Sequence, residues 1–223
     1  MSTKLTWVDG IVALVWLLPL AYLAAVYAQL PETVALHFDW KGAADRYGPK
    51  IELVGAILLL EGVSLGVGLL VRFLPRIDPK KKVRYSQGAF LKISYALVFF
   101  LAGMAVAIIY SSLKGHFVLD AHFLYPAIGL LMAYLGNLFN SLKPNYFVGI
   151  RTPWTLENER VWIKTHQFGG RLWLPGGLLL AVLTFFLPER AAQPCFVAGV
   201  VVLCVAPILY SYIVYRQLKE NTP

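Results

Sequence analysis

Long apolar runs separated by shorter polar segments dominate the pattern of this chain. Six of the runs are long enough to cross a hydrocarbon core about 30 Å thick, which takes about 20 helical residues. Backbone groups in lipid must be satisfied internally, so helices are the expected element, and no strand pattern competes with them. The pattern therefore predicts an all-α, multi-pass protein of the cell membrane. The expected transmembrane helices are residues 8–29, 51–73, 90–111, 121–140, 172–187 and 195–215.

Composition supports the membrane class. Of the 223 residues, 58% are hydrophobic and only 14% are charged, whereas soluble domains carry roughly 25% charged residues. The net charge of +8 would favour nucleic acid in a soluble protein. In a membrane protein, the positions of the basic residues report orientation instead, so no direct nucleic-acid contact is expected.

The lysines and arginines are distributed unevenly between the two sides of the predicted bundle. With the N-terminus inside, most of them fall on the inner side, including the basic segment 76–84. Cytoplasmic loops are enriched in these residues. We therefore expect both termini in the cytoplasm, the loop 30–50 outside and the loop 145–166 inside.

The inner loop 145–166 is far longer than the few residues that a connection between two helices needs. Pro144 and Pro153 prevent it from continuing the fourth helix. Thr152 or Thr155 can cap a short helix, and Pro153 suits its first position when Thr152 is the cap.

Two hypotheses describe this loop. In the first, Val161, Trp162 and Phe168 form the apolar face of an interfacial helix, which Trp154 and Trp162 anchor at the membrane surface. In the second, the polar turn that precedes this helix folds back into the bundle. There it either forms hydrogen bonds with the helix ends or contacts a ligand. The residues of that turn are Asn145, Gly149, Arg151 and Thr152.

A longer motif includes this loop. The run 144–156 reads Pro-Asn-Tyr-Phe-Val-Gly-Ile-Arg-Thr-Pro-Trp-Thr-Leu; Gly136-Asn137 precede it, and Trp162, Thr165-His166 and Gly169-Gly170 follow it. This arrangement resembles the signature of the SdpI family of bacterial membrane immunity proteins, over about residues 125–205. A run of this length and variety is too specific to arise by chance.

The outer loop carries a second resemblance. Leu30-Pro31, His37-Phe38-Asp39, Gly42, Asp45 and Lys50 are similar to the domain of unknown function that often precedes the SdpI region. That similarity covers about residues 12–60. It implies two parts: an N-terminal membrane region, 1–75, and an SdpI-like membrane region, 76–223.

Imidazoles and carboxylates gather on the predicted outer side of the chain. They are His37, Asp39, Asp45, His116, Asp120 and His122. Such groups can bind zinc, but their spacing matches no compact motif such as His-Glu-x-x-His. Capping and interfacial hydrogen bonding are therefore the favoured roles, Trp40 suits the membrane interface, and we expect no metal and no cofactor.

Glu61 lies near the middle of the second predicted helix, where a carboxyl group is costly and a functional role is the default hypothesis. It can stay protonated, pair with a lysine or arginine, or bond to Asn137 or Asn140. His166 and Arg151 become partners only if the inner loop folds inward. Beside it, Gly62 and Gly66 form a Gly-x-x-x-Gly pattern suited to close helix packing.

The resemblance implies a non-enzymatic immunity protein that protects a cell from a secreted peptide toxin. It also allows a signalling role, in which the protein holds a cytoplasmic transcriptional repressor at the membrane. Membrane lipids are expected partners as well. The expected toxin- or partner-binding residues are His37, Asp39, Trp40, Asp45, Asn145, Arg151, Thr152, Trp154 and His166, with no catalytic residue.

Two rival functions remain open. A membrane-embedded metal-dependent hydrolase would use His37, Asp39, His116 or His122 as ligands and Glu61 as acid or base, but no nucleophile–base pair has a recognisable spacing. A small proton-coupled transporter would use Glu61 as a proton relay, and the lack of several intramembrane charges weighs against it.

Overall fold

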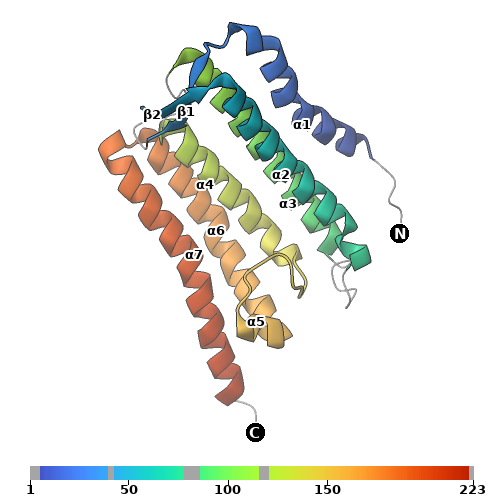
Figure 1. The fold of residues 1–223 in the computed structure, drawn as a ribbon. Helices are drawn as coiled ribbons and strands as arrows, with labels where there is room; N and C mark the ends of the chain where they lie inside the picture. Colours follow the sequence, from blue (N-terminus) through green and yellow to red (C-terminus); the bar gives the residue numbers. More distant parts are fainter. Residues whose placement is uncertain (1–5, 40–42, 78–85, 116–120, 221–223) are drawn as a thin grey trace. The chain divides into compact units, whose positions relative to one another are not determined.

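The computed structural model describes residues 6–39, 43–77, 86–115 and 121–220. Its contacts divide the chain into two compact units (Figure 1). The first unit comprises Met1–Arg72 and Ser94–Ala121, and the second comprises Phe73–Ile93 and His122–Pro223. The proposed division into regions 1–75 and 76–223 stays a prediction about sequence regions.

The described residues contain six helices that are long and apolar enough to cross a membrane. Large apolar side chains on them point away from the protein, with Leu59 71% exposed and Phe186 78% exposed, as expected for surfaces that face lipid. The all-α, multi-pass prediction is therefore confirmed. The cytoplasmic placement of both termini stays a prediction. The six helical spans are Trp7–Gln29, Lys50–Leu74, Gln87–Lys114, His122–Ser141, Glu159–Phe186 and Arg190–Glu220.

The first unit is built from helices and a small hairpin. Its apolar core includes Leu30, Val34, Leu53, Ile57 and Ile109, all buried. Its elements are α1 (Trp7–Val26), the 3-10 turn η1 (Tyr27–Gln29), β1 (Thr33–Phe38), β2 (Ala44–Pro49), most of α2 (Lys50–Ile77) and most of α3 (Gln87–Lys114).

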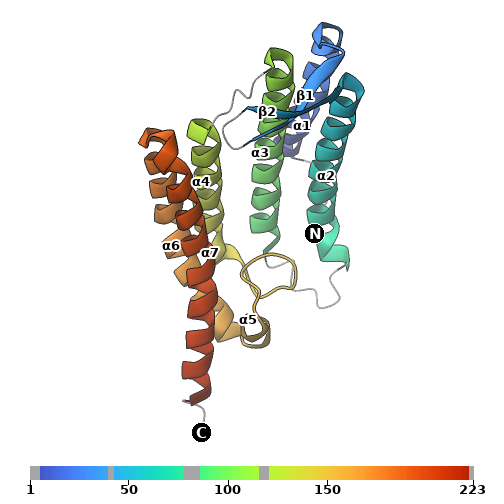
Figure 2. The same ribbon diagram turned by 60° about the vertical axis from the view of Figure 1, so that its left-hand side comes forward.

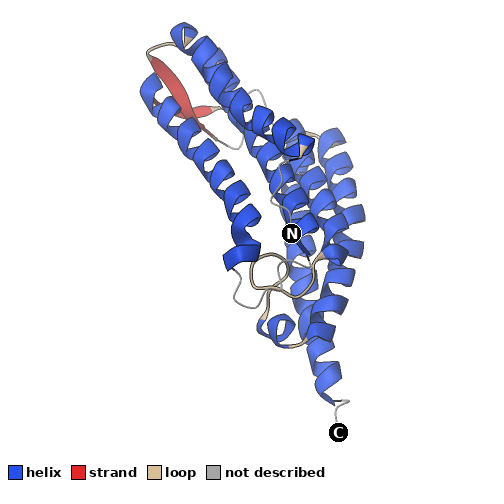
Figure 3. Ribbon diagram, turned by 90° about the vertical axis from the view of Figure 1, so that its right-hand side faces the viewer, coloured by secondary structure: helices blue, strands red, loops and turns tan. Residues whose placement is uncertain are grey.

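The hairpin differs from the prediction, because the sequence indicates a loop at residues 30–50 and shows no strand pattern there. β1 and β2 pair antiparallel and are drawn red in Figure 3. Val34 of β1 is buried in the apolar cluster, and the Ser112 hydroxyl of α3 donates to the Ala35 carbonyl at 2.9 Å. Packing against the helix ends thus stabilises two strands that carry little alternating pattern of their own.

An ion pair joins the three helices of the first unit. Asp9 caps the start of α1 with Thr6, accepts from Arg72 of α2 at 2.9 Å and accepts from the Tyr95 hydroxyl of α3 at 2.7 Å. No motif in the sequence points to these residues. Asp9 lies near the start of α1, and Arg72 lies near the end of α2. These positions are the one feature of the sequence that could have suggested the pair, because helices that run in opposite directions bring such ends together.

The second unit contains the loop 145–166 and three long helices. α4, α6 and α7 run beside one another in Figure 1 and in Figure 2, and the loop continues from the lower end of α4 toward α5. Its elements are α4 (Ala121–Leu138), the 3-10 turn η3 (Phe139–Ser141), α5 (Pro153–Glu157), α6 (Glu159–Phe186) and α7 (Glu189–Glu220), with the start of α3.

The predicted start of the fifth transmembrane helix at residue 172 is wrong. One continuous helix, α6, begins at Glu159, where the Asn158 side chain accepts from the backbone N–H groups of Arg160 and Val161 at 2.9 and 3.3 Å. Pro175 lies inside it, as membrane helices tolerate. The polar first turns therefore extend the spanning helix and do not form a separate interfacial element.

Close helix packing occurs between α4 and α6 and not at the predicted Gly-x-x-x-Gly pattern. A Cβ on Gly177 would lie 2.6 Å from the backbone nitrogen of Ala133 and from the carbonyl oxygen of Gly129. Among the residues that the structure describes, a Cβ on Gly62 or Gly66 would meet nothing within 4 Å. The expectation that Gly62 and Gly66 allow a close approach is thus wrong, and the small residues of α4 and α6 take that role.

Candidate functional site

Asn145 organises the turn that opens the signature loop, defined here as residues 142–158. Its side-chain oxygen accepts from the N–H groups of Phe147 and Val148, both at 2.8 Å. Its amide nitrogen donates to the carbonyls of Lys143 and Val148, both at 2.9 Å. Because Asn145 is buried, these four bonds satisfy its side chain and hold the backbone of the turn.

His166 fixes the loop onto α6. Its Nδ1 donates to the Trp162 carbonyl at 2.9 Å, and its Nε2 accepts from the Ile150 N–H at 3.0 Å. A carbonyl only accepts and an amide N–H only donates, so these contacts specify one neutral tautomer. The imidazole is buried and stacks on the Trp162 ring, with 4.1 Å between centroids.

Trp162 lies inside the protein and not at the membrane surface. Its side chain and that of Val161 are fully buried, and its indole N–H donates to the Leu142 carbonyl at 2.8 Å. The hypothesis that Trp162 and Val161 form an apolar face in the interface is therefore wrong. Tertiary packing of the loop over the start of α6 covers this face.

Gly149 brings the loop backbone against His166. Its φ of 124° lies in a region that L side chains rarely adopt. A Cβ there would overlap His166 Nε2, the atom that accepts from the next residue, Ile150, and would press on the Trp162 ring. Only glycine fits this position.

Thr152 caps α5, as the sequence predicted, with Pro153 as the first helical residue. The Thr152 and Thr155 side chains exchange bonds with each other's backbone N–H groups at 3.3 and 2.8 Å. The Trp154 indole N–H donates to the Ser211 hydroxyl of α7. Sequence reasoning missed Ser211, although a buried serine in an apolar spanning helix is itself a signal of a polar contact.

These contacts support the structural reading of the polar turn for Asn145, Gly149 and Thr152. Arg151 differs from them, because its side chain is exposed and, within the described part of the chain, only its Nη1 has a partner, the Tyr146 carbonyl at 2.6 Å. Within the described residues, no carboxylate pairs with Arg151. Its positive charge is therefore available to a ligand.

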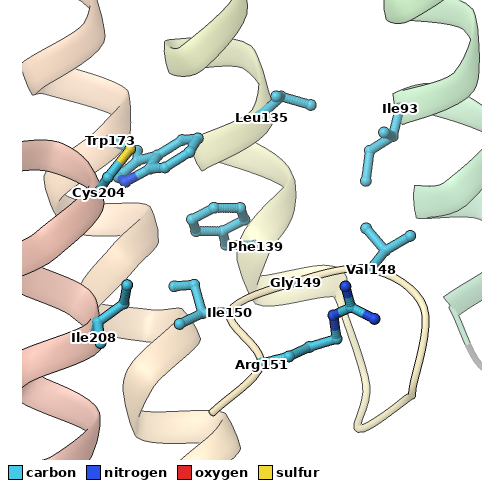
Figure 4. A pocket seen from close by; sticks show the side chains of 10 residues that line it. All are labelled: Ile93, Leu135, Phe139, Val148, Gly149, Ile150, Arg151, Trp173, Cys204 and Ile208. Atoms are coloured by element: carbon cyan, nitrogen blue, oxygen red, sulfur yellow. The ribbon is translucent and has the colours of Figure 1, made fainter. Parts of the chain in front are cut away.

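A cavity of about 390 Å³ lies beside the signature loop in the second unit. Arg151 is the one charged residue among the described residues that line it. Figure 4 shows the guanidinium near Val148, with side chains of α4, α6 and α7 around the remaining wall. The lining residues are Ile93, Leu135, Phe139, Val148, Gly149, Ile150, Arg151, Trp173, Cys204 and Ile208. The arrangement suits an apolar group that carries an anion.

The hairpin places two of the expected outer residues together. His37 Nδ1 and Asp45 Oδ1 lie 2.6 Å apart, and both side chains are exposed. Asp39 closes the turn, since its carboxylate accepts from the Ala43 N–H at 2.9 Å. Trp40 lies outside the described residues. The hairpin thus presents an exposed imidazole–carboxylate pair to a partner.

The described residues do not bring together a metal site. They contain no group of three His, Cys, Asp or Glu side chains placed to hold an ion. His122 approaches the Phe185 carbonyl at 3.3 Å, and His116 and Asp120 lie outside the described residues. The prediction of no metal stays a prediction, and the ligand set of the hydrolase alternative gains no support.

Glu61 is buried in the first unit. Neither of its carboxylate oxygens has a hydrogen-bond partner among the described residues, and the same holds for the hydroxyl of Ser64, one turn further along α2. The Glu61 carbonyl accepts from the Trp16 indole N–H at 2.9 Å. Asn137 and Asn140 belong to the second unit and are exposed. The role of Glu61 stays a prediction.

Comparisons with known proteins agree with the motifs. Residues 141–211 match the model of the SdpI/YfhL protein family, and residues 14–60 match a domain of unknown function, DUF1648. The chain is 32% identical to the immunity protein SdpI of Bacillus subtilis over 94 residues, which are 42% of this chain. The matched part spans 45% of that relative's length. No solved structure matches the chain.

The matched family region covers the whole signature loop, all of α6 and most of α7, and the matched N-terminal region covers the hairpin. The sequence motifs therefore point to the same family and to the same two segments as the comparisons. This chain is a multi-pass membrane protein in which residues 14–60 are similar to DUF1648 and residues 141–211 are similar to the SdpI/YfhL family.

Proposed function

We propose that this protein gives its cell immunity to a secreted peptide toxin that acts on the membrane. The observation that carries the proposal is the similarity to the immunity protein SdpI of Bacillus subtilis, together with the match of the SdpI/YfhL family over residues 141–211. The buried bonds of Asn145 and His166 lie in that region. They support the view that the family signature encodes a preformed loop.

The hairpin is the proposed contact for the toxin. It presents His37 and Asp45 as an exposed pair, and the distribution of basic residues favours an outer position for it. An exposed imidazole and carboxylate offer both a donor and an acceptor to a peptide backbone or side chain. Loss of either group is expected to weaken recognition while the strands remain paired.

Signalling through a cytoplasmic repressor is the finer part of the proposal. The signature loop, on the predicted inner side, would be the surface that a repressor meets once the toxin is bound. Such coupling requires two arrangements with different affinity for the toxin. Exposed Arg151 and half-buried Trp154 are the proposed contacts on this side.

A survival assay tests the immunity proposal. The protein is expressed in a Bacillus subtilis strain that lacks SdpI and is therefore sensitive, and the cells are challenged with a panel of secreted membrane-active peptides. We expect wild type to restore survival against at least one peptide. His37→Ala and Asp45→Ala are expected to reduce that protection about tenfold, because each removes a polar contact worth about 1.4 kcal/mol.

Arg46→Ala is the matched control for this assay. Arg46 is exposed and faces His37 in the strand register, and its exposed ion pair with Glu52 contributes at most about 1 kcal/mol. Protection by this variant should equal that of wild type. Survival that does not change on expression of wild type, with no peptide retained by the purified protein, would remove the immunity proposal.

A further inference from the structure

We propose that the cavity beside the signature loop binds one anionic phospholipid, with an acyl chain in the cavity and the phosphate on Arg151. The site includes no residue of the hairpin that is proposed to meet the toxin, so it stands without the toxin contact; it shares Arg151 with the proposed repressor surface. The lining supplies the first argument. Apart from Arg151, the described residues around the cavity are apolar or carry no charge, and such a wall favours a hydrocarbon chain.

The position of the cavity supplies the second argument. Cys204 and Ile208 line it from α7, and both are exposed on a helix that spans the membrane. The cavity therefore reaches a surface that faces acyl chains, and a lipid can enter without crossing water. Its volume of about 390 Å³ lies within the range of small-molecule sites, about 300–1,000 Å³.

The charge of Arg151 supplies the third argument. Its guanidinium is held by one bond to the Tyr146 carbonyl, which leaves further N–H donors for a ligand. Guanidinium binds phosphate with two parallel hydrogen bonds, which makes arginine well suited to this anion. Among the described residues no carboxylate competes for it.

The place of the signature loop in the chain supplies the fourth argument. Arg151 follows the end of a spanning helix, which closes with η3 at Ser141, and precedes α6, which begins at Glu159. A residue in the connection between two spans lies outside the hydrocarbon core, on the side where the headgroups are. The inner leaflet, to which the basic residues assign this loop, is the leaflet rich in anionic lipid.

Lipid retention in nanodiscs tests the site. The full-length protein is reconstituted into discs of equal parts phosphatidylglycerol and phosphatidylcholine, released into mild detergent and weighed intact by native mass spectrometry. We expect wild type to retain one phosphatidylglycerol in preference to phosphatidylcholine. Arg151→Gln should reduce this preference about tenfold, as expected for the loss of a charge-assisted bond to phosphate.

Two further variants separate the parts of the proposal. Arg160→Gln removes an exposed cation at the start of α6 that does not line the cavity, and it should keep the preference. Ile208→Trp should fill the cavity and lower retention of both lipids, with helix content by circular dichroism as the check on folding. Soluble glycerophosphoglycerol should not displace the lipid, because it has no acyl chain.

Several results would overturn the proposal. Equal retention of the two lipids by wild type would exclude an anion site. An unchanged preference in Arg151→Gln, or an equal loss in Arg160→Gln, would show that the charge of the bundle surface and not Arg151 selects the lipid. Displacement by glycerophosphoglycerol would show that the cavity does not hold the chain.

Discussion

Replacing Gly149 by alanine is expected to unfold the signature loop. The residue has a φ of 124°, and a side chain in that region costs about 1–3 kcal/mol. The new Cβ would also overlap His166 Nε2 and remove the bond to the Ile150 N–H, whose unsatisfied burial costs about 1–3 kcal/mol more. We therefore expect the free energy of unfolding to fall by about 2–6 kcal/mol.

Thermal unfolding in detergent, followed by circular dichroism and tryptophan fluorescence, measures this effect. The fluorescence should report it most directly, because Trp162 stacks on His166. Gly103→Ala is the matched control: Gly103 lies within α3, and a Cβ there meets nothing within 4 Å, so alanine should be neutral or should stabilise by up to about 1 kcal/mol. Equal melting of Gly149→Ala and wild type would contradict our description of the loop.

Replacing Gly177 by leucine is expected to separate α4 from α6. The first atom of the new side chain would lie 2.6 Å from backbone atoms of Gly129 and Ala133, and backbone atoms cannot move aside as a flexible side chain can. The helices would have to part along an interface that small residues keep close. The expected loss of stability is about 3 kcal/mol or more, as for an overpacked core.

Gly62→Leu makes the same chemical change on α2. Gly62 is exposed, and a Cβ there meets nothing within 4 Å, so leucine should be neutral or slightly stabilising in lipid. Denaturation of both variants in the same detergent series compares the two sites. If Gly62→Leu were the more damaging variant, the Gly-x-x-x-Gly pattern would be the true packing interface after all.

The sequence predicted the spanning helices well because lipid imposes a simple rule on them. Each must be long, apolar and internally hydrogen-bonded. A long run of high hydropathy in the sequence therefore identifies such a helix directly. The hairpin escaped prediction because its stability comes from contacts such as Ser112 with Ala35 and not from alternation. The start of α6 escaped it because polar residues past the apolar run can continue the same helix once Asn158 caps it.

The sequence indicated which residues belong to the candidate site, but it did not indicate which of them are in contact. Thr152, Pro153 and the capped helix follow from local chemistry, which sequence spacing reports. The bond from Ile150 to His166, and the one from Trp154 to Ser211, join residues that only folding brings together. The cavity draws its wall from several elements at once, so no spacing in the sequence could have predicted it.

The predicted placement of the hairpin outside the cell and of the signature loop inside it is the central claim of this account, and single-cysteine labelling tests it most directly. Cys195 and Cys204 are first replaced by alanine, and then Ala43→Cys in the hairpin turn and Glu157→Cys in α5 are made separately; both positions are exposed. Intact cells are treated with a membrane-impermeant maleimide. The account predicts that Ala43→Cys is labelled from outside and Glu157→Cys only after lysis. Labelling of both positions in intact cells, or of neither, would contradict it.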